Sequence, residues 1–128
     1  MKSFALPGAV LAISGVAAAA SPFDGRWAFD REICANKPGD TDMVPLEIKG
    51  DQITTYVSAC TIVTIDPIGN GLAAWRVSLS CLEEGDETEA KTAIDAIFAL
   101  YSDPDGNPLT LIEIDMASGT VDGYYPCP

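Results

Sequence analysis

The chain has 128 residues, a formal net charge of −12 at pH 7 and no histidine. The charge excludes nucleic acid as a partner, because binding to phosphates requires a basic face that displaces counterions. The lack of histidine removes the commonest general base and metal ligand, so the sequence predicts a protein that is not an enzyme and needs no cofactor.

Residues 1–20 have the pattern of a secretion signal. One cation, Lys2, precedes an apolar run from Phe4 to Val16, and four alanines occupy positions 17–20, the small-residue pattern that signal peptidase cleaves. We expect cleavage before Ser21, which leaves residues 21–128 as a single β domain with no membrane anchor. The predicted location is the periplasm or the extracellular space.

Segments of strand character alternate with turns through the first half of this domain. Segment 44–49 alternates aliphatic with other residues, which is typical of a half-buried strand. Segment 52–65 is rich in Ile, Val and Thr, and we expect one long strand with a bulge near Ser58 and Ala59. In segment 75–81 the odd-numbered residues share one apolar face. The glycine and proline turns between these segments predict an antiparallel meander.

The segment from Glu87 to Tyr101 fits two structures. Read with a period of 3.6, it has an apolar stripe and a capping box at its start, which together indicate a helix. Read with a period of two, it is a strand in a hairpin that sets Phe98 opposite Ile112 and Ile94 opposite Met116. We favour the strand, because this register matches apolar residues on both strands of the hairpin.

We therefore expect an all-β fold, a small antiparallel meander that forms a barrel or a sandwich of about seven or eight strands. Its core is expected to consist of alternating aliphatic and aromatic residues that face inward from these strands. The expected core residues are Trp27, Ile48, Ile53, Ile62, Trp75, Val77, Leu79, Phe98, Leu100 and Ile112.

The four cysteines are predicted to form two disulfides, because an exported domain lies in an oxidising compartment. None of their spacings matches a zinc site or a redox motif. We expect Cys60 to bond with Cys81, since an antiparallel register that pairs them keeps both side chains on the core face. The same register places Thr64 opposite Val77.

Cys34 and Cys127 are expected to form the second disulfide. Four cysteines allow three connectivities, so this pairing depends on the first one. A bond between them would join the first strand region to the last and close a loop of about 90 residues, a large constraint on the unfolded chain.

Gly25, Arg26 and Trp27 at the start of the first expected strand resemble the opening of lipocalin-like barrels, in which such a tryptophan closes one end of the barrel. The resemblance implies a β-barrel and, as one function, binding of a small ligand inside it. The layout of tryptophans and cysteines is also similar to that of small secreted bacterial β proteins with four cysteines. That second resemblance implies no activity.

The segment 118–121, Ser-Gly-Thr-Val, resembles the start of the Ser-Gly-x-x-Tyr loop that membrane-bound and periplasmic inhibitors of C-type lysozyme insert into the lysozyme cleft. Position 122 holds Asp122 where those inhibitors have tyrosine, and two tyrosines follow at 124 and 125. The resemblance implies contact with a cationic protein. The residues that it implies in this contact are Ser118, Gly119, Tyr124 and Tyr125.

Acidic residues cluster after the strand that contains Cys81. Glu83, Glu84 and Glu87 are expected on a solvated loop, where they would attract a cationic protein or peptide. Two functions are therefore open. The first is a non-catalytic periplasmic or secreted module that binds a cationic partner such as lysozyme, and the alternative is a lipocalin-like barrel that binds a small ligand.

Overall fold

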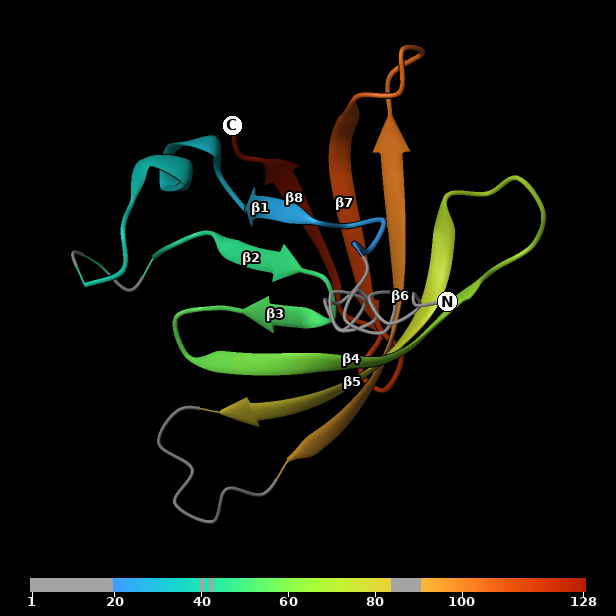
Figure 1. The fold of residues 1–128 in the computed structure, drawn as a ribbon, viewed down its shortest axis with the longest axis horizontal. Helices are drawn as coiled ribbons and strands as arrows, with labels where there is room; N and C mark the ends of the chain where they lie inside the picture. Colours follow the sequence, from blue (N-terminus) through green and yellow to red (C-terminus); the bar gives the residue numbers. More distant parts are fainter. Residues whose placement is uncertain (1–19, 40, 42, 84–90) are drawn as a thin grey trace, which may run out of the picture.

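Eight strands form a closed antiparallel barrel in the computed structural model, which describes residues 20–39, 41, 43–83 and 91–128 (Figure 1). Each strand pairs with the next, and β8 pairs with β1 to close the sheet. The predicted all-β meander is confirmed, and it is a barrel. The predicted signal peptide lies outside the described residues apart from Ala20. The elements are β1 (Gly25–Ala28), the 3-10 helix η2 (Arg31–Ala35), β2 (Leu46–Lys49), β3 (Gln52–Thr54), β4 (Ser58–Pro67), β5 (Ala74–Glu83), β6 (Thr92–Ser102), β7 (Pro108–Asp115) and β8 (Val121–Pro126).

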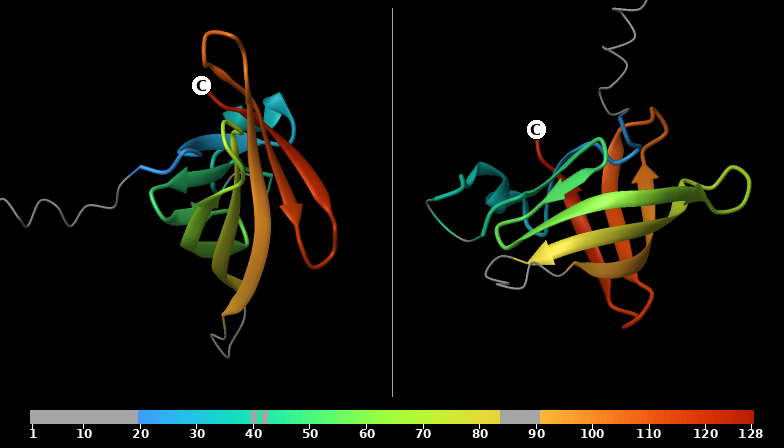
Figure 2. Two further views of the ribbon diagram at one scale, coloured as in Figure 1. Left: turned by 90° about the vertical axis from the view of Figure 1, so that its right-hand side faces the viewer. Right: turned by 60° about the horizontal axis from the view of Figure 1, so that its bottom comes forward.

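The barrel is strongly curved. In Figure 1, β1 to β4 run across the view while β6 and β7 run nearly upright, because the long strand β5 between them bends around the barrel. Figure 2 shows two further sides, with the β6–β7 hairpin extending past its neighbours. Within the described residues, no helix is long and apolar enough to span a membrane.

Alternation along the strands places one face of each inside the barrel. Most of the predicted core is confirmed, and the inward face of β5 is as predicted. Four further core residues, Phe23, Ala96, Leu111 and Tyr124, were not predicted. The confirmed core residues are Trp27, Ile48, Ile53, Ile62, Val77, Leu79 and Phe98, which are buried, and Trp75 and Leu100, which are partly buried against them.

The segment around β6 is a strand, so the favoured interpretation is confirmed over the helix from Thr92 onward. The first residues of the segment, up to 90, lie outside the described residues. The predicted pairing of Ile94 with Met116 is wrong, because the Met116 amide donates to the carbonyl of Asp95. The hairpin therefore has a register that differs by one residue from the predicted one.

A bulge in the β6–β7 hairpin causes this difference. Beyond Leu109, which is the extra residue, Phe98 lies opposite Glu113, and Ile112 lies opposite Ala99. A shift of one residue moves every following side chain to the other face of the sheet. The prediction that Ile112 is in the core is therefore wrong, because it faces outward, and Glu113 faces the barrel interior in its place.

The predicted single strand 52–65 is two strands, β3 and β4, joined by a tight turn at residues 55–57. The bulge expected near Ser58 and Ala59 is wrong, since both residues pair regularly with β5. A bulge occurs instead at Val63, and as a result Thr64 lies opposite Ser78 rather than Val77. The bulge bends β4, which helps a short sheet to close into a barrel.

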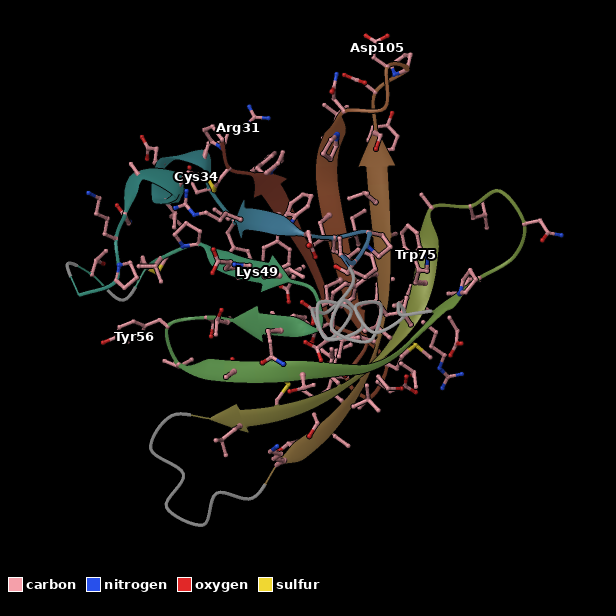
Figure 3. The ribbon with its side chains drawn as sticks, in the orientation of Figure 1. Arg31, Cys34, Lys49, Tyr56, Trp75 and Asp105 are labelled. Carbon is pink, nitrogen blue, oxygen red and sulfur yellow. A yellow bond between two sulfur atoms is a disulfide. The ribbon has the colours of Figure 1, made fainter. Side chains whose placement is uncertain are left out.

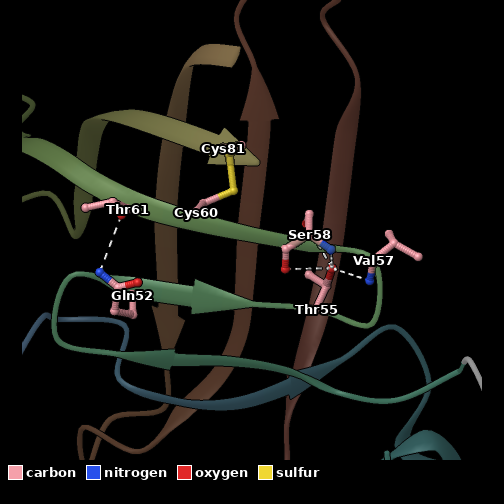
Figure 4. Close-up of a disulfide and its surroundings, with 7 residues drawn as sticks. All are labelled: Gln52, Thr55, Val57, Ser58, Cys60, Thr61 and Cys81. Carbon is pink, nitrogen blue, oxygen red and sulfur yellow. Dashed lines mark hydrogen bonds between the residues drawn. A yellow bond between two sulfur atoms is a disulfide. The ribbon is translucent and has the colours of Figure 1, made fainter. Parts of the chain in front are cut away.

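Both predicted disulfides are present. Cys60 and Cys81 are directly opposed on β4 and β5, with their Cα atoms 4.0 Å apart (Figure 4). Cys34 in η2 bonds Cys127 at the end of β8, with Cα atoms 5.4 Å apart, and Figure 1 shows the C-terminus near η2. Two disulfides indicate that the protein folds in an oxidising compartment.

Candidate ligand-binding pocket

Aromatic side chains seal one end of the barrel. Phe23 has no exposed surface, and its ring makes edge contacts with Trp75 and Phe98 at centroid distances of 5.0 and 4.9 Å. The indole N–H of Trp27 donates to the Phe23 carbonyl over 2.8 Å. A turn in which Asp24 Oδ1 accepts from the amides of Ser21 and Gly50 fixes this segment against the barrel. These three rings therefore fill the barrel interior at this end.

The opposite side of the barrel, where β1 ends and β2 begins, contains a pocket of about 290 Å³. Its inner residues come from the strands, and its rim comes from η2, the segment before β2 and the β3–β4 turn. Most of the lining is apolar or aromatic. The lining residues are Trp27, Ala28, Phe29, Ile33, Met43, Val44, Leu46, Thr55, Tyr56, Val57 and Tyr124.

Polar contacts at the two ends of η2 hold the wall that this helix forms. Asp30 caps the helix by accepting from the Glu32 amide, and Ile33 turns inward as its buried residue. The amide side chain of Asn36 donates to the Met43 carbonyl over 2.6 Å, which ties the helix to the segment before β2. The Arg26 guanidinium donates to the carbonyl of Cys34 over 2.9 Å. These contacts fix the wall relative to β1.

The wall formed by the β3–β4 turn is organised by one hydroxyl. Thr55 Oγ1 accepts from the amides of Val57 and Ser58 over 3.2 and 2.9 Å (Figure 4). This hydroxyl-centred turn leaves Tyr56 and Val57 about half exposed, at 48% and 50%. Figure 3 shows Tyr56 at the tip of this turn, across the barrel from Trp75 at the sealed end.

Several large apolar side chains at the rim of the pocket are exposed to solvent. Phe29 is 57% exposed and Met43 is 54% exposed. The Phe29 ring lies 4.8 Å from the ring of Tyr124, measured between centroids. A group of exposed apolar side chains around a concave apolar surface is a feature of ligand-binding sites.

Tyr124 connects the pocket to a carboxylate inside the barrel. It is a buried residue of β8 that lines the pocket, and its hydroxyl donates to Glu113 Oε1 over 3.2 Å. Burial raises the pKa of Glu113; the Tyr124 hydrogen bond opposes this effect, and the carboxylates of Asp122 and Asp115 add to it. Burial also raises the pKa of Tyr124, as do the nearby carboxylates, so the hydroxyl stays protonated and remains a donor.

The structure separates the residues implied in partner binding. Ser118 and Gly119 lie exposed in the β7–β8 turn, where Asp115 Oδ1 accepts from the Ser118 amide over 3.2 Å. Tyr124 faces inward, whereas Tyr125 faces outward beneath the guanidinium of Arg31, which lies 4.5 Å from its ring centroid. Glu83 is the last residue of β5. Glu84 and Glu87 lie outside the described residues.

The pocket itself was not predicted from the sequence. Its rim residues lie in turns and in the segment before β2, where no periodic pattern shows which way a side chain points. The inward orientation of Glu113 depends on the bulge at Leu109, which the turn sequence did not reveal. One available signal was the apolar character of Tyr56 and Val57, which is unusual for residues of a tight turn.

Comparison with protein families, with characterised proteins and with solved structures finds no match to this chain. Among the described residues, no group of three Cys, Asp or Glu side chains is arranged to hold a metal ion. The feature of this chain that points to a function is therefore the geometry and chemistry of the pocket.

Proposed function

We propose that the protein binds a small, largely apolar ligand in the pocket between η2 and the β3–β4 turn. The observation that supports this proposal is a concave, apolar and aromatic cavity of about 290 Å³ on a closed barrel whose other end is sealed. Ligand pockets typically have volumes of about 300–1,000 Å³. The cavity is just below this range, so the ligand is a compact molecule rather than a long lipid.

The lipocalin-like resemblance supports the same function. Trp27 is buried in the first strand, lines the pocket and hydrogen-bonds the segment that seals the other end. Together with the disulfides, the secretion signal expected at residues 1–20 suggests a ligand carrier or scavenger outside the cytoplasm. Two disulfides suit such a role, because they keep a small barrel folded without its ligand.

The test is binding of tert-butylbenzene to the disulfide-bonded protein, followed by the rise in melting temperature that ligand binding causes. Phe29→Ala is expected to weaken binding about tenfold, since it removes roughly 1.4 kcal/mol of buried apolar contact. The matched control is Tyr101→Ala, because Tyr101 is 65% exposed and does not line the pocket. Equal effects of the two substitutions would contradict the proposal.

A second proposed function is binding of a cationic protein such as a C-type lysozyme. Its support is the exposed Ser118–Gly119 turn at the same end of the barrel as Glu83, an arrangement that follows from the antiparallel strand order. The net charge of −12 suits such a partner. Ser118, Gly119 and Glu83 do not line the pocket, so one protein can have both functions.

Binding to lysozyme is tested by calorimetry at low and high salt. Exposed charges are screened by salt, so the proposal predicts an affinity that falls steeply as the salt concentration rises. Ser118→Lys is expected to weaken binding severalfold by placing a cation at the contact, and Thr110→Lys on the outer face of β7 is the control. No binding at low salt would refute this second function.

A further inference from the structure

We infer that the pocket selects a small organic cation, such as a quaternary ammonium group attached to an apolar body. The inference rests on the proposed function and specifies the chemical class of the ligand. Aromatic residues make up 8% of the chain but contribute four of the eleven residues that line the pocket. These four are Trp27, Phe29, Tyr56 and Tyr124.

Aromatic lining distinguishes a cation site from a general apolar site. The faces of aromatic rings carry partial negative charge and attract ammonium groups, including those that have no proton to donate. Aliphatic side chains would hold a neutral apolar ligand equally well. Phe29 and Tyr124 lie with ring planes at 30° to each other, and Tyr56 extends from the facing turn. A ligand between these two walls would contact rings from both.

The charged group next to the pocket is negative, as a cationic ligand requires. The Tyr124 hydroxyl donates to Glu113, and donation to a carboxylate makes the phenol ring more electron-rich and a better partner for a cation. Among the described residues, no lysine or arginine lines the cavity. Glu113 thus supplies a negative charge behind one aromatic wall, in a setting where burial strengthens its field.

The same features act against anionic ligands. A fatty acid or another apolar carboxylate would place its charge near Glu113 and would approach a protein with a net charge of −12. Repulsion opposes both its approach and its binding, whereas a cation is attracted at long range. An apolar cation therefore fits the lining of the pocket, the partly buried carboxylate of Glu113 and the charge of the whole molecule.

The experiment compares two probes of nearly equal shape, phenyltrimethylammonium and tert-butylbenzene, which differ in one positive charge. Calorimetry on the intact disulfide-bonded protein is expected to show binding of the cation at least about tenfold tighter than that of the neutral probe. Benzenesulfonate, which carries a negative charge, is expected to bind more weakly than either.

Variants locate the source of the preference. Glu113→Gln keeps an acceptor for the Tyr124 hydroxyl and removes the negative charge, so it is expected to reduce the preference for the cation severalfold. The control is Glu47→Gln on the exposed face of β2, which is expected to leave the preference unchanged. Tyr56→Leu keeps apolar area at a half-exposed position, so the variant is expected to fold and to weaken binding of the cation only. Tyr101→Leu is its control.

The outcomes separate this inference from the proposed function. Binding of the neutral probe as tightly as the cation would overturn the inference and leave the ligand pocket in place. A preference that neither Glu113→Gln nor Tyr56→Leu reduces would also overturn it. If neither probe binds, the proposed function itself fails.

Discussion

Glu113 lowers the stability of the folded protein but supplies the negative charge of the proposed ligand site. It occupies an inward position in β7 opposite Phe98, where an aliphatic side chain would pack at no electrostatic cost. Its only hydrogen bond partner among the described side chains is the Tyr124 hydroxyl. A charge that is kept at the expense of stability commonly indicates a functional position.

Glu113→Gln is expected to raise the melting temperature at pH 7. The pKa of Glu113 is raised above 4.5 in the folded protein, mainly by burial, so its ionised form is less stable in the native state than in the unfolded state. This penalty is present above the folded pKa and disappears below about 4.5, where both states are protonated. Thermal melts of the two proteins from pH 7 to pH 4 should therefore converge. A variant less stable at pH 7 would contradict this assignment.

The rim elements are too short to be stable alone. A single 3-10 turn such as η2 has weak hydrogen-bond geometry, and among its residues only Ile33 is buried. Its position depends on the Asn36 and Arg26 hydrogen bonds and on the disulfide from Cys34 to Cys127. The disulfide therefore stabilises both the closed barrel and one wall of the pocket.

Replacing both cysteines, Cys34→Ala with Cys127→Ala, is expected to reduce the free energy of unfolding by about 4 kcal/mol, because the bond closes a loop between residues 93 apart. Urea unfolding of the variant and the parent protein measures this loss. The intact Cys60–Cys81 bond serves as an internal reference for correct oxidation. A loss below about 1 kcal/mol would show that the bond adds little to the closure of the barrel.

At the scale of the whole molecule, the sequence predicted the features that depend on local alternation of apolar residues or on the pairing of cysteines. Alternation predicted the inward face of β5 and the strand character of β6. The pairing of Cys60 with Cys81 predicted both disulfides, since it leaves the other two cysteines to bond with each other. Each of these features depends on neighbouring residues, or on a register that a bonded pair defines.

The remaining features depend on backbone irregularities that the sequence did not reveal. Bulges at Val63 and Leu109 each add one residue to a strand and invert the faces that follow. The second bulge turns Ile112 outward and Glu113 inward, so it decides the chemistry of the site. The pocket walls come from turns brought together by barrel closure, which no local pattern specifies.

The most direct measurement is an amide NMR titration of the isotope-labelled protein with phenyltrimethylammonium and, in parallel, with tert-butylbenzene. If the pocket between η2 and the β3–β4 turn binds ligands, saturable shifts will appear at Phe29, Tyr56, Tyr124 and the indole N–H of Trp27, while Tyr101 stays unchanged. Absence of saturable shifts at these residues with both probes, or shifts confined to the outer face of β6 and β7, would contradict this function.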